Sequence, residues 1–474
     1  MDSMEIARQN DLSFKMAPYL DAHMICPLLD FLREVELYDN KAIAKEKIRL
    51  IVKTNMLELV QDEINTVPED DASIHADPNL SKKHLEDRTN AIFDKMDNES
   101  DAVKLCSEFF NNEELVESLK SGDNLTIEYV SAHHGITVAV LEEYYKFSKF
   151  KYDCGMYTDA EDMLGNYLSI VQSQTSTVLG ALWGRLACRI LQAKWDDSLT
   201  DLHAIKEAIE SRSIAPMDQL RQRAWLMHWA LFVFLNQRDG TDALYEFFSE
   251  KIYLQTIENL CPWLLRYYTC AAILSSRRRV VMRDVLNEIL ATSYLHSDPM
   301  TQFVESLYDR FDFEEAQQRL TECLSIIKND FFLQLYEDRF LHEARLLVCE
   351  VYCGINRRVD MVTLAEKLQL SEEEAEKWMV EMVRGASAAN SQEGSSSGAS
   401  HALASAGVSF NARIDSSGKQ VLMAPPPKMA HQKVADKTRD LTVRAGILNS
   451  NLESLMNEQG EYIIRQQQMR AQNA

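Results

Sequence analysis

The amino-acid sequence predicts an all-α protein: a TPR/HEAT-like helical-repeat solenoid that ends in a winged helix with a small β-hairpin, followed by a C-terminal helix. The chain has only 15 glycines and 10 prolines among 474 residues, and this depletion argues against strand-and-turn architectures. Apolar residues recur at three- and four-residue spacing along most of the chain, which is typical of amphipathic helices. Near the end, two short helical patterns precede two strand-like segments, which is the order of a winged helix.

The length fits two to three folded units, because ordinary domains hold about 100–200 residues. We expect an N-terminal helical-repeat domain at 1–220, a second domain at 221–425 and a C-terminal helix at 426–474. In the second domain, helical repeats run to about residue 355 and the winged helix occupies 356–425. A stretch of mainly Ala, Gly and Ser at 385–409 interrupts the winged helix. We expect it to be a disordered insertion, because it cannot bury enough apolar surface to offset chain entropy.

A repeated motif predicts where helices of the solenoid begin. It consists of an aromatic residue, two polar residues and a small residue, as in Tyr157-Thr-Asp-Ala160, Trp195-Asp-Asp-Ser198 and Phe313-Glu-Glu-Ala316. Gly240-Thr-Asp-Ala243 is a weaker version that lacks the aromatic ring. The small residue lets one helix approach its partner closely, while the aromatic ring fills the gap at the turn. The irregular intervals between the motifs are typical of helix-pair repeats that bury their apolar faces on their neighbours.

The N-terminal part is predicted to be helical but unevenly packed. Residues 12 to about 65 are interpreted as two or three helices. Pro27 is expected to open one of them, because proline is tolerated in the first turn of a helix. Residues 66–102 are polar and acidic, and we expect a loop and a weakly packed helix there.

The winged helix contains the clearest local signals. Met361–Leu368 is a short amphipathic helix, and Ser371-Glu-Glu-Glu374 is a capping box that opens the next helix. Ala412–Asp415 and Gln420–Met423 are interpreted as two strands joined by a turn. An open strand edge can pair with a strand of another chain. We therefore expect an interaction edge at Ile414, Val421, Leu422 and Met423.

An apolar heptad follows the winged helix. Apolar side chains recur every seven residues from Val434, with further ones at intermediate positions. A lone helix that exposes such a seam is marginally stable in water. We therefore expect the terminal helix to pack against another protein surface through Val434, Leu441, Leu448, Leu452 and Leu455.

The charge balance limits the classes of partner. The chain has 50 basic and 73 acidic residues and a net charge of −23, which disfavours nonspecific binding to nucleic acid or anionic membranes. The helix at 372–384 is itself acidic, so we do not expect the winged helix to read DNA. The longest apolar run, at 224–235, is too short to cross a membrane, which needs about 20 residues. The dense basic run is either a solvated helix start or a contact for RNA or an acidic partner; it comprises Arg277, Arg278, Arg279 and Arg283.

No catalytic constellation stands out in the sequence. His342-Glu-Ala-Arg-Leu346 begins like a zinc-protease helix but has leucine in place of the second histidine, and phosphate-binding glycine loops are missing. The nine cysteines include no CxxC pair, and we expect them to be reduced and mostly buried. The sequence thus predicts a non-enzymatic protein without metal or cofactor that works in the cytoplasm, with a nuclear pool left open.

Several stretches resemble a known family. The solenoid, the acidic winged helix and the heptad helix together are similar to the PCI-domain family of the proteasome lid, the signalosome and eukaryotic translation initiation factor 3. Longer segments resemble the e-subunit family of that initiation factor, and the resemblance extends over about residues 12–424. These segments include His23-Met-Ile-Cys-Pro-Leu-Leu-Asp-Phe-Leu32, Arg223-Ala-Trp-Leu-Met-His-Trp229, Cys261-Pro-Trp-Leu-Leu-Arg-Tyr267 and Asn329-Asp-Phe-Phe-Leu333.

The resemblance implies a scaffold role. Members of the family join other PCI subunits edge to edge through their winged helices, and their C-terminal helices gather in a bundle. By the same resemblance, the assembled factor binds the small ribosomal subunit and helps to recruit mRNA through the cap-complex scaffold protein. Two alternatives stay open: a PCI subunit of the proteasome lid or signalosome, and a direct RNA-binding helical-repeat protein.

Overall fold

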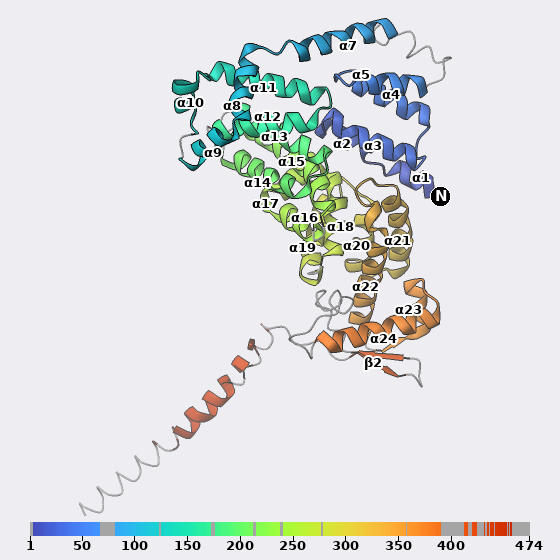
Figure 1. Ribbon diagram of the computed structural model, residues 1–474. Helices are drawn as coiled ribbons and strands as arrows, with labels where there is room; N and C mark the ends of the chain where they lie inside the picture. The colour runs from blue at the N-terminus through green and yellow to red at the C-terminus, as the bar shows by residue number, and fades with distance from the viewer. Residues whose placement is uncertain are drawn as a thin grey trace, which may run out of the picture.

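Helices stack on one another along most of the chain, and a small sheet lies near its C-terminal end (Figure 1). The all-α prediction, with helical repeats followed by a winged helix, is confirmed. The computed structural model describes residues 3–66, 81–122, 125–171, 176–211, 215–237, 240–275, 278–356, 358–389, 412–415 and 420–423, and parts of 431–456.

Short helices form the N-terminal part. They are α1 (Ser3–Gln9), α2 (Ser13–Met16), the 3-10 turn η1 (Ala17–Tyr19), α3 (Ala22–Glu34), α4 (Asn40–Ile51) and α5 (Leu57–Thr66). Pro27 lies inside α3, so the prediction that it opens a helix is wrong. α3 instead begins after Asp21, whose carboxylate accepts a hydrogen bond from the backbone N–H of His23 at 3.0 Å. The helix continues through the proline because the burial of Met24 and Leu28 on either side outweighs the lost hydrogen bond.

Within the described residues, further helices connect this part to the repeats. They are α7 (Lys82–Asp97), α8 (Asp101–Asn111), α9 (Glu113–Ser121) and α10 (Ile127–His134). Leu85 is the buried side chain of α7, which confirms the predicted weakly packed helix. Residues 67–80, where a loop was expected, lie outside the described residues.

The repeats begin where the sequence motif predicts them. α12, α14 and α21 start at Tyr157, Trp195 and Phe313, and the small residues of these motifs are fully buried. The repeat elements are α11 (Val138–Asp153), α12 (Tyr157–Ile170), α13 (Ser176–Leu191), α14 (Trp195–Ser211), α15 (Pro216–Leu235), α16 (Gly240–Ser249), α17 (Lys251–Leu260), η3 (Pro262–Leu264), α18 (Leu265–Leu274), α19 (Arg278–Thr292), α20 (Pro299–Tyr308), α21 (Phe313–Lys328), η4 (Gln334–Tyr336) and α22 (Glu337–Ile355).

The weaker motif also starts a helix, and its glycine has a steric reason. A Cβ atom at Gly240 would lie 1.6 Å from the carbonyl oxygen of Phe234, far inside any permitted contact. The end of α15 therefore passes directly against the start of α16, and only glycine fits at this position.

The hydrophobic core runs through the expected domain boundary. Position 220 lies inside α15, and a single cluster of buried apolar residues extends from Leu12 to Val421. The division into domains at this point therefore stays a prediction, and it would cut a continuous helix.

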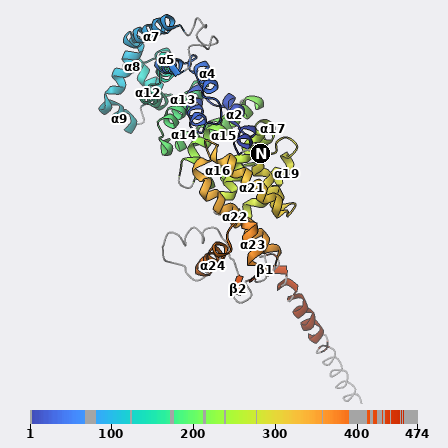
Figure 2. The ribbon, with the colours of Figure 1, turned by 90° about the vertical axis from the view of Figure 1, so that its right-hand side faces the viewer.

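A buried guanidinium joins four segments of the chain. Arg266 of α18 is 2 % exposed and donates to both carboxylate oxygens of Asp298, at 3.0 and 2.8 Å, and to Asp330 at 3.3 Å. It also donates to the backbone oxygen of Asn10 at 2.5 Å. Burial lowers the pKa of Arg266, but the charge of Asp298 outweighs this and holds the pKa above its usual value. The N-terminal segment is thereby fixed against the later repeats, and α1 packs on α21 (Figures 1 and 2).

A second contact holds the N-terminal segment on α15. The ring of Tyr19 stacks on His228 with centroids 4.5 Å apart, and the indole N–H of Trp229 donates to the carbonyl of Tyr19 at 3.0 Å. The indole N–H of Trp263 can only donate, so Nε2 of His228 must accept its bond of 3.1 Å. The imidazole proton is therefore on Nδ1, which donates to the carbonyl of Ala224 at 2.7 Å. Burial lowers the pKa of His228 to about 4, so the ring is neutral.

The winged helix follows α22. It consists of α23 (Met361–Leu368), α24 (Glu372–Ala389) and three strands, β1 (Arg358–Asp360), β2 (Ala412–Asp415) and β3 (Gln420–Met423). The predicted capping box is confirmed: the backbone N–H of Glu374 donates to Oγ of Ser371 at 3.4 Å, and the backbone N–H of Ser371 donates to the Glu374 carboxylate at 3.1 Å.

α24 is longer than the sequence suggested. It runs to Ala389, so the first residues of the insertion expected at 385–409 are helical, and that start is corrected. The reason is composition, because alanine has the highest helix propensity and extends a helix that is already capped. Residues 390–409 of the expected insertion lie outside the described residues.

The order of the sheet corrects the expected interaction edge. β3 is the central strand, antiparallel to β1 on one side and to β2 on the other. Val421, Leu422 and Met423 therefore do not lie at an open edge, because β3 is flanked on both sides. Of the described strands, β2, which contains Ile414, and β1 form the edges of this sheet.

Replacing Arg266 by methionine should lower the free energy of unfolding by about 3–5 kcal/mol, because Asp298 and Asp330 are left buried without a counter-charge. The shift in the midpoint of urea unfolding of the purified chain measures this loss. Adding Asp298→Asn and Asp330→Asn should recover part of it, because the amides are neutral. Arg310→Met is the control, since this exposed side chain forms a surface pair with Glu305 and should change the midpoint little. Equal effects at the two arginines would contradict the role of Arg266.

His228 should make the folded chain sensitive to acid. The pKa of the imidazole is about 6.5 in the unfolded chain and about 4 in the folded chain. Stability is therefore complete above about pH 6.5 and falls as the pH drops towards 4, because the unfolded chain binds the proton first. The difference in pKa corresponds to about 3 kcal/mol. Thermal unfolding at neutral and mildly acidic pH should show a smaller loss for His228→Gln, whose amide oxygen can still accept from Trp263. The same loss in both chains would show that other groups carry the acid sensitivity.

Candidate assembly surfaces

The outer edge of β2 is an open backbone edge at the end of the fold, below α24 in Figure 1. Ile414 of β2 lies opposite Val421 of β3, and none of the described strands pairs with the other side of β2. Val421 is fully buried and belongs to the core of the winged helix, whereas its neighbour Leu422 is 37 % exposed. Of the residues that the sequence assigned to the interaction edge, Ile414 is the one whose strand is open.

The helix beside this sheet carries exposed negative charge. Glu372, Glu373, Glu374 and Glu376 are exposed at the start of α24. Hydrogen bonds from the side chain and backbone of Ser371 lower the pKa of Glu374, so this carboxylate stays ionised. Such a surface repels a phosphate backbone and suits a protein partner.

The C-terminal helix exposes its heptad. Figures 1 and 2 show its described part projecting away from the helical repeats. Val434, Leu441, Leu448 and Leu452 are 54–64 % exposed, and no described side chain covers them. Leu455, the last member of the predicted set, lies outside the described residues.

The same helix has a second apolar stripe, which the heptad analysis missed. Val443 and Ile447 are 58 and 56 % exposed and lie four residues apart on the side opposite to the heptad. A two-stranded coiled coil covers one narrow seam, whereas a bundle can cover two sides of a helix. The pattern therefore favours a bundle with more than one neighbouring helix.

The arginine run is only partly described. Arg277 lies outside the described residues, and the side chains of Arg278 and Arg279 in the first turn of α19 are not described either. Arg283 is exposed on α19. An RNA contact at these arginines stays a prediction.

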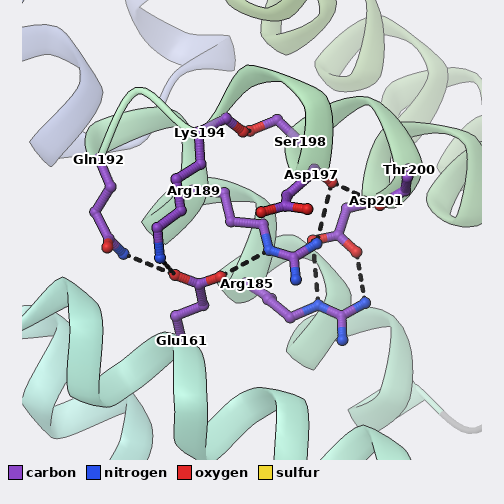
Figure 3. Close-up of polar contacts among 9 residues, drawn as sticks. All are labelled: Glu161, Arg185, Arg189, Gln192, Lys194, Asp197, Ser198, Thr200 and Asp201. Carbon is purple, nitrogen blue, oxygen red and sulfur yellow. Dashed lines mark hydrogen bonds and ion pairs between the residues drawn. The ribbon is translucent and has the colours of Figure 1, made fainter.

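Sequence reasoning missed a charged network between repeat helices (Figure 3). Arg185 and Arg189 of α13 both contact the carboxylate of Asp201 in α14, at 2.5 and 2.8 Å. Arg189 also donates to Glu161 of α12 at 2.9 Å, and Lys194 donates to the other oxygen of Glu161 at 2.7 Å. We call this set the Glu161 network.

The Glu161 network ties three successive helices together. Burial raises the pKa of Glu161, but hydrogen bonds from Lys194 and Arg189 outweigh this and hold it below its usual value. Asp201 is 1 % exposed and is neutralised by both arginines. Charges that are fully paired in this way hold helices in register and offer no free acid or base. The signal in the sequence was the spacing of Arg185 and Arg189, which lie one helical turn apart.

Candidates for a metal or thiol site in the described part of the chain are clusters of metal-ligating side chains and pairs of cysteines. In the described ranges, no group of three or more His, Cys, Asp or Glu side chains is arranged to hold a metal ion. Cys349 and Cys353 are buried free thiols with their sulfur atoms 3.8 Å apart. The hydrogen bond with Cys353, together with burial, raises the pKa of the Cys349 thiol. None of the described helices is long and apolar enough to span a bilayer.

Comparison with known proteins gives two family matches and several relatives that match along most of their length. The family described as eIF3 subunit 6 N terminal domain matches residues 11–151, and the PCI domain family matches residues 320–385. The E subunit of eukaryotic translation initiation factor 3 from Arabidopsis thaliana is 33 % identical over 464 residues, which cover 95 % of this chain and 98 % of that protein. The E subunits from Yarrowia lipolytica and Aspergillus clavatus are both 32 % identical and cover 93 and 94 % of this chain, and 99 and 93 % of their own length. The chain belongs to the E-subunit family of eukaryotic translation initiation factor 3.

The two family matches correspond to two structural parts of the chain. The first extends from α2 to α11 and so includes most of the N-terminal segment that Arg266 and His228 hold in place. The PCI match extends from α21 to α24, which includes the last repeat helices and the two helices of the winged helix. The family resemblance inferred from the sequence is confirmed, and the relatives carry the name of the initiation factor rather than that of the proteasome lid or signalosome.

Proposed function

We propose that the chain is a non-enzymatic scaffold subunit of eukaryotic translation initiation factor 3. It assembles with other PCI subunits of the factor and supports recruitment of mRNA to the small ribosomal subunit in the cytoplasm. This proposal rests on one observation: the C-terminal part of the chain carries two surfaces that no described residue covers. They are the outer edge of β2 and the exposed heptad helix. The names of the relatives supply the complex in which these surfaces would be satisfied.

The sheet edge supports pairing with a sister subunit. An unpaired strand presents a row of backbone N–H and C=O groups that another strand can match with main-chain hydrogen bonds. In the small sheet of this chain, β2 has one partner where the central strand has two. Addition of a partner strand at β2 would extend the sheet across two winged helices.

The terminal helix supports insertion into a bundle. Its two apolar stripes lie on opposite sides and are exposed in the isolated chain. Burial of a leucine side chain stabilises an association by about 1.5–3 kcal/mol, so several such residues hold a helix firmly. Helices from several subunits would cover both stripes at once.

The charge supports an indirect route to RNA. With a net charge of −23, the chain as a whole repels the phosphate backbone. We therefore assign contacts with the small ribosomal subunit and the cap-complex scaffold protein to the assembled factor rather than to this chain alone.

Introducing charge into the heptad should release the subunit. Leu441→Asp with Leu448→Asp should leave the repeats folded but weaken recovery of partner subunits by about tenfold or more, because two buried carboxylates would face apolar partners. Affinity purification followed by quantitative mass spectrometry measures the recovery. The matched control is Thr442→Asp with Asn451→Asp, which adds the same charge on the flanks between the two stripes. Undiminished recovery with the heptad variant would contradict the bundle.

Assembly should protect the amides of β2. Amide hydrogen exchange of the free chain should show exchange at the outward N–H groups of Ala412–Asp415, and this exchange should slow in the purified complex. The segment Gln420–Met423 is the internal control, because β3 is paired on both sides in the free chain and should not change. If protection of β2 is the same in the free chain and in the complex, strand pairing at this edge is wrong.

A further inference from the structure

Side chains of α8, α9, α12 and α13 line a groove in the N-terminal half of the chain. Figure 1 shows these four helices at the end of the fold away from α23 and α24. Its volume is about 680 Å³. Phe110 of α8 and Val116 of α9 line it but are only 9 and 8 % exposed, and Gly165 of α12 supplies bare backbone. The arginines of the Glu161 network also line it. A groove of this size can hold several residues of an extended peptide.

Gly165 has no packing reason to be glycine. It lies inside α12, where glycine destabilises the helix relative to alanine, and a Cβ atom there would meet nothing within 4 Å. The glycines of the adjoining α13 differ, because a Cβ at Gly180 would lie 2.6 Å from the hydroxyl of Tyr145 and one at Gly184 would lie 3.1 Å from Leu164. Packing thus accounts for those two glycines, whereas Gly165 leaves helix backbone open at the groove. A glycine at such an open position allows the backbone of another chain to approach the helix closely.

The charges that are free in the groove are negative. Glu117 of α9 and Asp162 of α12 line it, are exposed, and form no ion pair with a described side chain. The two arginines that line it are already held by Asp201 and Glu161. The groove therefore offers carboxylates to a ligand but few free cations.

We propose that this groove binds an extended segment of a partner protein that carries lysine or arginine side chains. The backbone of that segment lies over Gly165, and its cationic side chains lie between Glu117 and Asp162. This site lies outside the winged helix and the terminal helix, so it does not depend on the assembly role assigned to them.

The same charges argue against nucleic acid as the occupant. A phosphate backbone would be repelled by the two carboxylates, and the groove offers no unpaired arginine to replace its counterions. A basic peptide gains two charge-assisted contacts, and its binding should weaken as salt increases.

Fluorescence anisotropy of the full chain with a labelled peptide of alternating glycine and lysine tests the proposal. Glu117→Lys with Asp162→Lys should weaken binding by about tenfold or more. Gly165→Trp should do the same by filling the groove, whereas Gly165→Ala adds a single methyl group in open space and should bind as the wild type does. Glu58→Lys with Glu207→Lys, exposed carboxylates that do not line the groove, is the control for net charge.

The outcomes separate the possibilities. Loss of binding in the groove variants alone supports the proposal, and thermal unfolding of each variant confirms that it is folded. If Gly165→Trp does not fold, the test is the comparison of peptide binding by Glu117→Lys with Asp162→Lys and by the control variant Glu58→Lys with Glu207→Lys. Equal weakening by both charge reversals would show attraction to the acidic surface in general and overturn the proposal. Equal binding of a glycine–glutamate peptide, or tighter binding of a labelled RNA oligonucleotide, would overturn it as well.

Discussion

The buried guanidinium of Arg266 is the contact on which the arrangement of the whole chain depends. A solenoid is held by contacts between neighbouring repeats, so its two ends are normally independent of each other. Here the acceptors around Arg266 come from the chain before the first repeat, from the start of α20 and from the turn after α21. Moving the start of α20 or the turn after α21 would leave a buried charge unpaired, and moving Asn10 would leave a buried guanidinium N–H without its carbonyl acceptor. The early and late parts of the chain therefore form one body, which carries the candidate assembly surfaces.

Features that depend on neighbouring residues could be predicted from the sequence. The motifs at Tyr157, Trp195 and Phe313 start helices because ring, polar pair and small residue all act within one turn. The capping box at Ser371 is local in the same way. Pro27 could not be placed correctly because burial elsewhere on α3 decides whether a helix tolerates proline. β1 is three residues long, which is too short to produce a recognisable sequence pattern. It pairs with β3, which lies about sixty residues further along the chain. Because β1 could not be recognised, the central position of β3 could not be predicted.

The same distinction between local and long-range features applies to the candidate surfaces. The heptad was visible because its period is a property of one helix, and its exposure follows from the absence of a partner within the described chain. The Glu161 network and the groove beside it were not visible, because they require distances between α9, α12, α13 and α14. In sequence, paired arginines and scattered carboxylates resemble an ordinary solvated face, and a glycine inside a helix looks like any other. Only the space around Gly165 distinguishes it from the two glycines of α13.

The strand order of the small sheet has a consequence for the growing polypeptide. The strand that both others require is the last of the three to leave the ribosome, and the heptad helix comes later still. β1 and β2 consequently cannot pair with β3 until the whole winged helix has been synthesised. The central strand and the heptad helix therefore become available only after the helical repeats have been synthesised.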